Sequence, residues 1–190
     1  MAAAAEWLEG ARPRTLPTAI APVLAGTAIA ITDGGARWGL AALCLVVALG
    51  LVIGVNFAND YSDGVRGSDG EDRVGPLRLV GSGLAEPSHV RVAAFACFAV
   101  SAVAGLVITI MTGHWWFIAV GVVCILAAWF YTGGSHPYGY AGLGEIFVFI
   151  FFGLVAVGGT IYVQTDHVGA AGWVTACLIG ATACLSLIHI

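Results

Sequence analysis

The chain has 190 residues, of which 59% are hydrophobic and 9% are charged, and its formal net charge is -4 at pH 7. Soluble proteins carry about 25% charged residues, and one soluble domain of this length has too little interior to bury so many apolar side chains. The composition therefore excludes an ordinary soluble domain and predicts an integral membrane protein. Because no basic stripe is present, nucleic acid is not expected as a partner.

Six apolar runs are long enough to be membrane helices, each of which needs about 20 mostly apolar residues. Five of them cover residues 15–31, 38–57, 90–111, 115–131 and 143–164, and a sixth starts at residue 171. Pro17 and Pro22 predict a kink near the start of the first run. The predicted fold class is all-α, a polytopic bundle of transmembrane helices in the lipid bilayer.

The arginines indicate the orientation of this bundle, because short cytoplasmic loops retain positive charge. Six of them lie before the first run or near the connection between the second and third: Arg12, Arg14, Arg66, Arg73, Arg78 and Arg91. Arg37 lies on the other side. We therefore expect the N-terminus, the segment after the second run and the loop 132–142 to be cytoplasmic.

The stretch "NFANDYSDGVRGSDGEDRVGPLRLVGSG", residues 56–83, carries five acidic residues and three arginines. On a helix, Asn56, Asp60 and Asp63 lie on one stripe at i, i+4 and i+7, with Asn59 beside it. An Asp at the bilayer centre would cost about 2.5–3.5 kcal/mol, so we expect the stripe to face a polar cavity where the second helix leaves the lipid. On another side of this helix, residues 50 and 54 are glycines, which predict close packing against a neighbouring helix.

Oxygen ligands and arginines in one segment predict a site for a divalent cation and a phosphate. Two carboxylates one turn apart repel each other unless a positive charge lies between them. Mg²⁺ suits Asp60 and Asp63, with Asn56 as a carbonyl ligand, because proteins hold it with one or two carboxylates plus substrate phosphates. The arginines that follow, Arg66, Arg73 and Arg78, have guanidinium groups that bind phosphate oxygens in pairs.

Other interpretations of this stretch remain open. Acidic loops beside membrane helices are often only solvated. An EF-hand calcium loop fits poorly, because Asp or Asn at every second position before Gly is missing. An ion-coupled transporter would carry its ionisable groups near the bilayer midplane, whereas here they cluster at the edge. The position favours an enzyme over a transporter or a structural membrane protein.

The motif "NDYSDGVRGSDGEDRVGPLR" resembles the first aspartate-rich motif of the UbiA superfamily of intramembrane prenyltransferases. Within that superfamily it is similar to the 1,4-dihydroxy-2-naphthoate polyprenyltransferases. The resemblance extends to "ARPRTLPTAIAPVLAGT" and to "YTGGSHPYGYAGLGEIFVFIFFGLVAVGGTIYVQ", and so covers nearly the whole chain to about residue 183.

The resemblance implies a bundle of nine membrane helices, of which about six are present here, and a second aspartate motif that this sequence lacks. We therefore expect residues 1–184 to be the N-terminal part of a single prenyltransferase domain. Residues 185–190, "LSLIHI", are interpreted as a non-native tail. The chain by itself is expected to be inactive.

The resemblance also implies an activity, in which a polyprenyl group passes from polyprenyl diphosphate to 1,4-dihydroxy-2-naphthoate with loss of CO₂ and pyrophosphate. The product is demethylmenaquinol, and the location is the cell inner (plasma) membrane. Asp60 and Asp63 would be catalytic and would bind Mg²⁺ with Asn56. The residues implied to bind the diphosphate are Asn56, Asn59, Arg66, Asp69, Arg73 and Arg78, with Asp72 as the alternative to Asp69. An acceptor such as 4-hydroxybenzoate is the alternative within the superfamily.

Several residues near the cytoplasmic face have two open interpretations. The loop residues Tyr131, His136, Tyr138 and Tyr140 are typical interfacial anchors, although they could also line the mouth of the cavity. Glu145 begins the fifth run, where it could cap a helix or lie beside the aromatic substrate.

Overall fold

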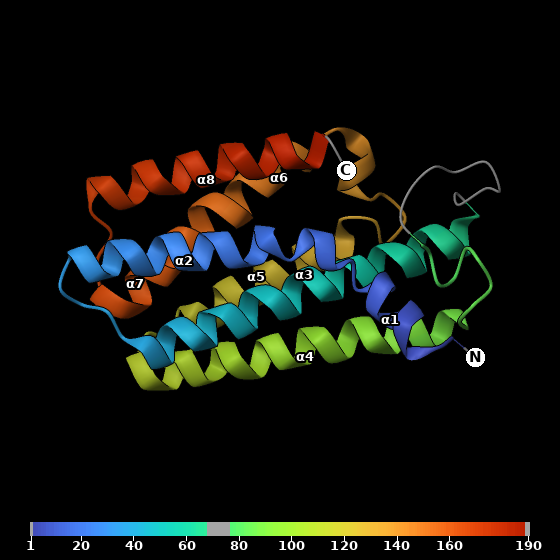
Figure 1. Cartoon of the computed structure of the whole chain (residues 1–190), viewed down its shortest axis with the longest axis horizontal. Coiled ribbons are helices and arrows are strands. Elements are labelled where there is room, and N and C mark those ends of the chain that lie inside the picture. Colours follow the sequence, from blue (N-terminus) through green and yellow to red (C-terminus); the bar gives the residue numbers. More distant parts are fainter. Residues whose placement is uncertain (1, 68–76, 189–190) are drawn as a thin grey trace.

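The computed structural model describes residues 2–67 and 77–188, and side chains up to residue 186. Within these residues the regular structure is helical, which confirms the all-α prediction. Eight α-helices follow in chain order: α1 (Ala4–Gly10), α2 (Pro17–Thr32), α3 (Trp38–Arg66), α4 (Pro87–Thr112), α5 (Phe117–Phe130), α6 (Gly144–Val148), α7 (Ala156–Thr165) and α8 (Ala170–Ile188). A π-helical segment (Phe149–Val155) joins α6 to α7, and 3-10 turns occupy Pro13–Thr15 and Tyr138–Ala141. Figure 1 shows the long helices lying side by side along the long axis.

Helices occupy all six predicted positions, but they differ in length. Within the described residues, three of them are long and apolar enough to cross a membrane: α3, α4 and the continuous segment Gly144–Thr165. A fourth span results if Ala4–Thr15 and Pro17–Thr32 count together, and these two are bent by 49° at the break before Pro17. This agrees with the kink predicted near the start of the run, while Pro22 lies inside the continuous helix α2. α5 and α8 are shorter apolar helices. α5 is short because Gly113, at φ 75°, ends α4, and residues up to Trp116 form the turn that precedes α5.

Helix α3 is longer than its apolar run and continues through the aspartates to Arg66. It packs closely along α4, and the two predicted glycines lie at this contact. A Cβ on Gly54 would lie 2.5 Å from the ring of Phe98, and a Cβ on Gly50 would lie 3.0 Å from the carbonyl oxygen of Cys97. The predicted close packing at these glycines is confirmed.

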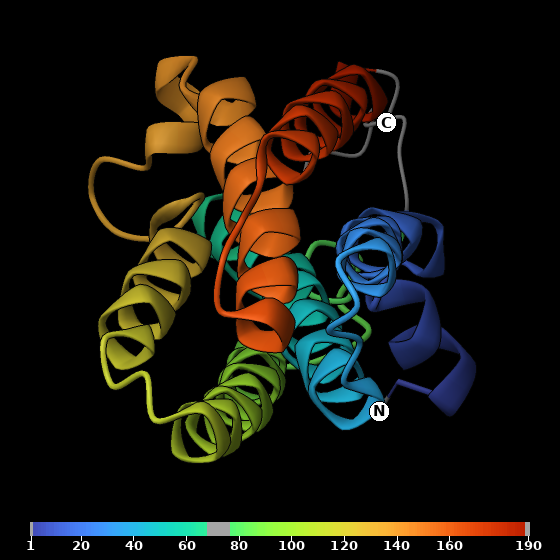
Figure 2. The ribbon, with the colours of Figure 1, turned by 90° about the vertical axis from the view of Figure 1, so that its left-hand side faces the viewer.

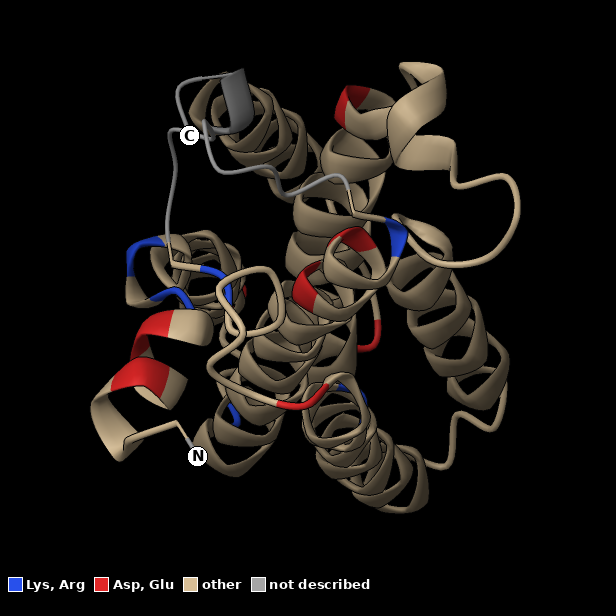
Figure 3. Ribbon diagram, turned by 90° about the vertical axis from the view of Figure 1, so that its right-hand side faces the viewer, with Lys and Arg blue, Asp and Glu red and all other residues tan. Residues whose placement is uncertain are grey.

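Figure 2 shows α3, α4, α5 and the α6–α7 segment following one another around the long axis, with α2 and α8 completing the arrangement. The α6–α7 segment is fixed against α8 at Gly153 in its π-helical part. A Cβ on Gly153 would lie 2.6 Å from the carbonyl oxygen of Ala176. The end of the bundle that carries α1 and the C-terminal end of α3 holds both signs of charge (Figure 3).

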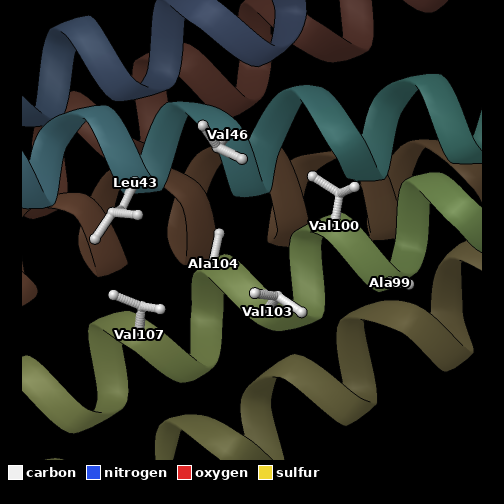
Figure 4. Close-up of a pocket in the computed structure, with 7 residues that line it drawn as sticks. All are labelled: Leu43, Val46, Ala99, Val100, Val103, Ala104 and Val107. Atoms are coloured by element: carbon white, nitrogen blue, oxygen red, sulfur yellow. The ribbon is translucent and has the colours of Figure 1, made fainter.

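On its outer side, the α3–α4 pair forms a groove of about 410 Å³. Figure 4 shows the lining: Leu43 and Val46 from α3, and Ala99, Val100, Val103, Ala104 and Val107 from α4. All of these side chains are aliphatic. Such a surface suits the hydrocarbon of a bilayer, and together with the apolar spans it makes the chain an integral membrane protein.

Candidate active site

A cavity of about 760 Å³ lies inside the bundle, on the other side of α3 from the outer groove. The size is within the range of about 300–1,000 Å³ that is usual for ligand sites. One face of α3 lines this cavity. We call its lining residues, which recur with each helical turn, the α3 row: Cys44, Val47, Ala48, Leu51, Val52, Val55, Asn56, Asn59 and Asp63. From Cys44 to Asp63 this row is about 28 Å long, at 1.5 Å per residue. The cavity therefore extends over most of a bilayer core that is about 30 Å thick.

The cavity has a polar end and an apolar end. Asn56, Asn59 and Asp63 lie at the polar end, together with Arg78 from the segment before α4, and all four side chains are buried. Below Asn56 the α3 row is apolar except for the thiol of Cys44. The sequence predicted that Asn56, Asp60 and Asp63 face a polar cavity with Asn59 beside them. Of these residues, Asn56, Asn59 and Asp63 line the cavity, and Asp60 does not.

Asn56 fixes the segment between α1 and α2 against α3. Its amide nitrogen donates hydrogen bonds to the carbonyl oxygen of Ala11 and to the hydroxyl of Thr15, both at 2.9 Å. Its carbonyl oxygen is therefore the atom that a ligand in the cavity can use. Between the two contacts, Arg12 adopts a left-handed backbone conformation at φ 55° and lines the cavity. Sequence reasoning missed Arg12, because neither this conformation nor its contact with α3 leaves a local pattern.

Asp63 is the carboxylate that lies at the cavity. Arg78 donates to it at 3.0 Å, in an ion pair whose two side chains are about nine-tenths buried. The hydroxyl of Tyr140 also donates to Asp63. An arginine, a carboxylate and a tyrosine hydroxyl from three separate segments thus meet at the polar end.

Asp60 lies beside the α3 row and not in it. Its carboxylate accepts hydrogen bonds from the backbone N–H groups of Leu79, at 2.7 Å, and Val80, at 3.0 Å, and its residue is 1% exposed. On a helix Asp60 is about 60° away from Asp63, on the side opposite Asn59. The α3 residues that face the cavity are therefore Asn56, Asn59 and Asp63, and the metal role of Asp60 stays a prediction.

Arg66 connects the end of α3 to the loop after α5. Its guanidinium donates to the carbonyl oxygens of Thr132 and Gly134, and it lies 5.7 Å from the ring centre of Tyr140. The hydroxyl of Thr132 donates to the side-chain amide oxygen Oδ1 of Asn59 at 2.7 Å. The structure thus uses Arg66 to hold this loop over the polar end, while its predicted contact with diphosphate stays a prediction.

The loop tyrosines line the cavity. Tyr131, Tyr138 and Tyr140 are among the lining residues, which supports the interpretation of these side chains as part of the mouth. Burial, reinforced by the neighbouring carboxylate of Asp63, raises the pKa of Tyr140 above its ordinary value, so its hydroxyl stays protonated at neutral pH. His136 and Glu145 are not among the lining residues, and Glu145 lies in the first turn of α6.

Three predicted site residues lie outside the described residues: Asp69, its alternative Asp72, and Arg73. Among the described residues, no group of three or more His, Cys, Asp or Glu side chains could hold a metal ion. The oxygen atoms that could do so at the cavity are the carboxylate of Asp63 and the amide carbonyls of Asn56 and Asn59. This set fits Mg²⁺, because Mg²⁺ is commonly held by one or two carboxylates and completed by substrate phosphates.

Comparisons with known proteins match the chain to one family and to several relatives. The UbiA prenyltransferase family matches residues 19–190. A 1,4-dihydroxy-2-naphthoate octaprenyltransferase of Mycobacterium tuberculosis is 57% identical over 99% of this chain, and one of Escherichia coli is 39% identical over 94%. A 2-carboxy-1,4-naphthoquinone phytyltransferase of Synechocystis is 26% identical over 84%. The chain spans 64%, 58% and 51% of these three relatives, respectively. No solved structure matches the chain significantly.

Proposed function

Because the chain belongs to the UbiA prenyltransferase family, we propose that it forms the donor-binding part of a 1,4-dihydroxy-2-naphthoate polyprenyltransferase. The observation that carries the proposal is the shape and polarity of the cavity. A polyprenyl diphosphate has a multiply charged anionic head and a long apolar tail, and the cavity has one polar end and an apolar length of bilayer depth.

The diphosphate lies at the polar end in this proposal. Arg78 and Arg12 supply guanidinium groups that match phosphate oxygens, and Asp63 with the carbonyl oxygens of Asn56 and Asn59 would hold Mg²⁺. When bound, Mg²⁺ would neutralise the charge that develops on the departing pyrophosphate. The bonds of Asp60 to the amides of residues 79 and 80 fix the segment that carries Arg78, and its predicted role as a metal ligand stays a prediction.

The reaction breaks the bond between the first prenyl carbon and the diphosphate oxygen, and pyrophosphate leaves with the electron pair. The ring carbon of the naphthoate that carries the carboxylate then bonds to the prenyl carbon, and CO₂ leaves as the ring becomes aromatic again. Arg78, which is 7% exposed, stabilises the leaving anion in a site from which water is largely excluded. The apolar walls keep water away from the allylic cation.

The acceptor assignment rests on the relatives, whose names specify a naphthoate. The proposed orientation rests on the arginines at the end that carries the site, because short cytoplasmic loops retain positive charge, and it puts the site at the cytoplasmic face of the plasma membrane. We extend the proposal to Asp69 and Arg73 as further contacts of the diphosphate, from their place in the aspartate-rich motif.

The test uses an Escherichia coli strain that lacks its own 1,4-dihydroxy-2-naphthoate octaprenyltransferase. The strain receives either this chain or this chain continued by the C-terminal third of the Mycobacterium tuberculosis relative. We expect the continued chain to restore demethylmenaquinone, measured by mass spectrometry, and its Asp63→Asn variant not to do so. Prenylated hydroxybenzoate in place of the naphthoate product would overturn the acceptor assignment. A continued chain that accumulates in the membrane without any prenylated quinone would overturn the proposed activity.

A further inference from the structure

The apolar end of the cavity has a floor. Ile108 of α4, Phe117 of α5 and Val163 of α7 line the cavity and belong to one hydrophobic cluster with the buried Leu40. Behind this floor, Trp116 stacks on Phe117 with ring centres 4.1 Å apart. The floor is thus a packed layer at the end of the bundle opposite Asp63.

Three glycines line the cavity one helical turn from the floor. Gly105 precedes Ile108 by three residues, Gly121 follows Phe117 by four, and Gly159 precedes Val163 by four. α4 and the α6–α7 segment run toward the floor while α5 runs away from it, so all three glycines lie on the side of the floor that faces the polar end. They form a ring of glycines around the deep part of the cavity.

Helix packing among the described residues does not account for these glycines. A Cβ on Gly54 or Gly153 would meet a neighbouring helix within 2.6 Å, whereas a Cβ on Gly105, Gly121 or Gly159 would have no described atom within 4 Å outside its own helix backbone. Glycine weakens a helix relative to alanine, so a helical glycine with no close neighbour calls for another reason. Here the missing side chains widen the cavity just above its floor.

The chemistry of this deep part favours an apolar occupant. The hydroxyl of Thr109, which lies at this depth, donates to the carbonyl oxygen of Gly105 within its own helix at 2.9 Å. A naphthoate carboxylate at this depth would lose its hydration, and the arginines among the described lining residues, Arg12 and Arg78, lie at the polar end, so this position is unfavourable. An isoprenoid tail has no polar group to satisfy. The acceptor therefore belongs nearer the polar end.

We propose that the space between the floor and the ring of glycines binds the distal isoprene units of the donor, so that Phe117, Ile108 and Val163 set the longest prenyl segment held inside the protein. This rests on the proposed function, because it requires the diphosphate to be at Asp63. Gly105, Gly121 and Gly159 are then specificity-determining positions, whose substitution by larger residues shortens the segment that fits.

The test is photo-crosslinking of the 190-residue chain in lipid nanodiscs. The probes are geranyl, farnesyl and geranylgeranyl diphosphates with a diazirine on the terminal isoprene unit, added with Mg²⁺, and the labelled residues are mapped by mass spectrometry. We expect the label to move toward the floor as the probe lengthens and to reach Phe117 or Ile108. Excess unlabelled donor should prevent this labelling, and Asp63→Asn should abolish it.

Matched variants add the same side chain inside and outside the cavity. Gly159→Leu narrows the deep part, whereas Gly39→Leu adds a leucine at an exposed glycine of α3 that also has no atom within 4 Å. We expect floor labelling by the longest probe to fall at least about tenfold in Gly159→Leu and to be unchanged in Gly39→Leu, since about 1.4 kcal/mol corresponds to tenfold. The positions labelled in the wild-type chain test the proposal even if Gly159→Leu fails to fold.

Two results would overturn the proposal in different ways. Labelling that depends on Asp63 but falls on Ala183 of α8 would mean that the diphosphate binds as proposed while the prenyl tail leaves the cavity sideways. Binding of the tail between the floor and the ring of glycines would then be wrong, and the proposed function would stand. Labelling that is independent of Asp63, or that falls on Val46 and Val103 in the outer groove, would indicate partition from lipid. That result would contradict the proposed function as well.

Discussion

Substitution of Asp60 tests whether its carboxylate binds a metal or holds the backbone of residues 79 and 80. Its carboxylate accepts the N–H groups of Leu79 and Val80 at 2.7 and 3.0 Å in a site that is 1% exposed. Hydrogen bonds to a charged group contribute roughly 1.5–3 kcal/mol each, so Asp60→Ala should lower the free energy of unfolding by about 3–6 kcal/mol. Asp60→Asn keeps one acceptor oxygen and should cost about half as much.

Hydrogen exchange of the chain in nanodiscs, followed by mass spectrometry, measures this effect where it arises. We expect the amides of Leu79 and Val80 to exchange faster in Asp60→Asn than in wild type. Asp166→Asn at the opposite, exposed end of the bundle is the matched control and should leave these amides unchanged. Unaltered exchange and stability in Asp60→Asn, together with loss of Mg²⁺-dependent donor binding, would refute the structural role and support direct metal ligation.

Two further predictions concern packing and pH. Gly54→Leu places a side chain where even a Cβ would lie 2.5 Å from the ring of Phe98, so it should lower the free energy of unfolding by at least about 1–3 kcal/mol. The control Gly39→Leu should change this free energy little. Equal unfolding midpoints of the two variants in detergent would contradict the prediction. The raised pKa of Tyr140 means that its contact with Asp63 is complete below the ordinary tyrosine pKa of about 10 and is lost as pH rises through the raised value. Ultraviolet difference titration of wild type against Tyr140→Phe should show this group titrating above 10, and a midpoint at or below 10 would show that the contact is absent.

Much of the fold follows from local sequence. Runs of apolar residues located the helices of the bundle, although not the short α1. The pair of glycines at positions 50 and 54 predicted close packing against a neighbouring helix, which the structure shows to be α4, because helical spacing places both on one side. The same spacing placed Asn56 and Asp63 at a cavity. These features depend on the 3.6-residue period, which is visible in the sequence.

The remaining features depend on contacts between distant residues. Asp60 is only about 40° from Asn56 around α3, so spacing alone could not show that the amides of residues 79 and 80 turn its carboxylate away from the cavity. Likewise, Arg12 reaches the site because Asn56 donates hydrogen bonds to Ala11 and Thr15, which lie on either side of Arg12 in the chain. The role of Arg66 in holding the loop after α5 depends on backbone carbonyls, which have no sequence signature.

Pulsed EPR with Mn²⁺ in place of Mg²⁺ can detect whether a cation and a diphosphate meet at the polar end of the cavity. In the wild-type chain with geranylgeranyl diphosphate, we predict a hyperfine coupling between Mn²⁺ and the phosphorus nuclei, because the carboxylate of Asp63 and the donor would share the ion. The coupling should disappear in Asp63→Asn. A coupling of wild-type strength in Asp63→Asn would contradict a cation and diphosphate site at this carboxylate.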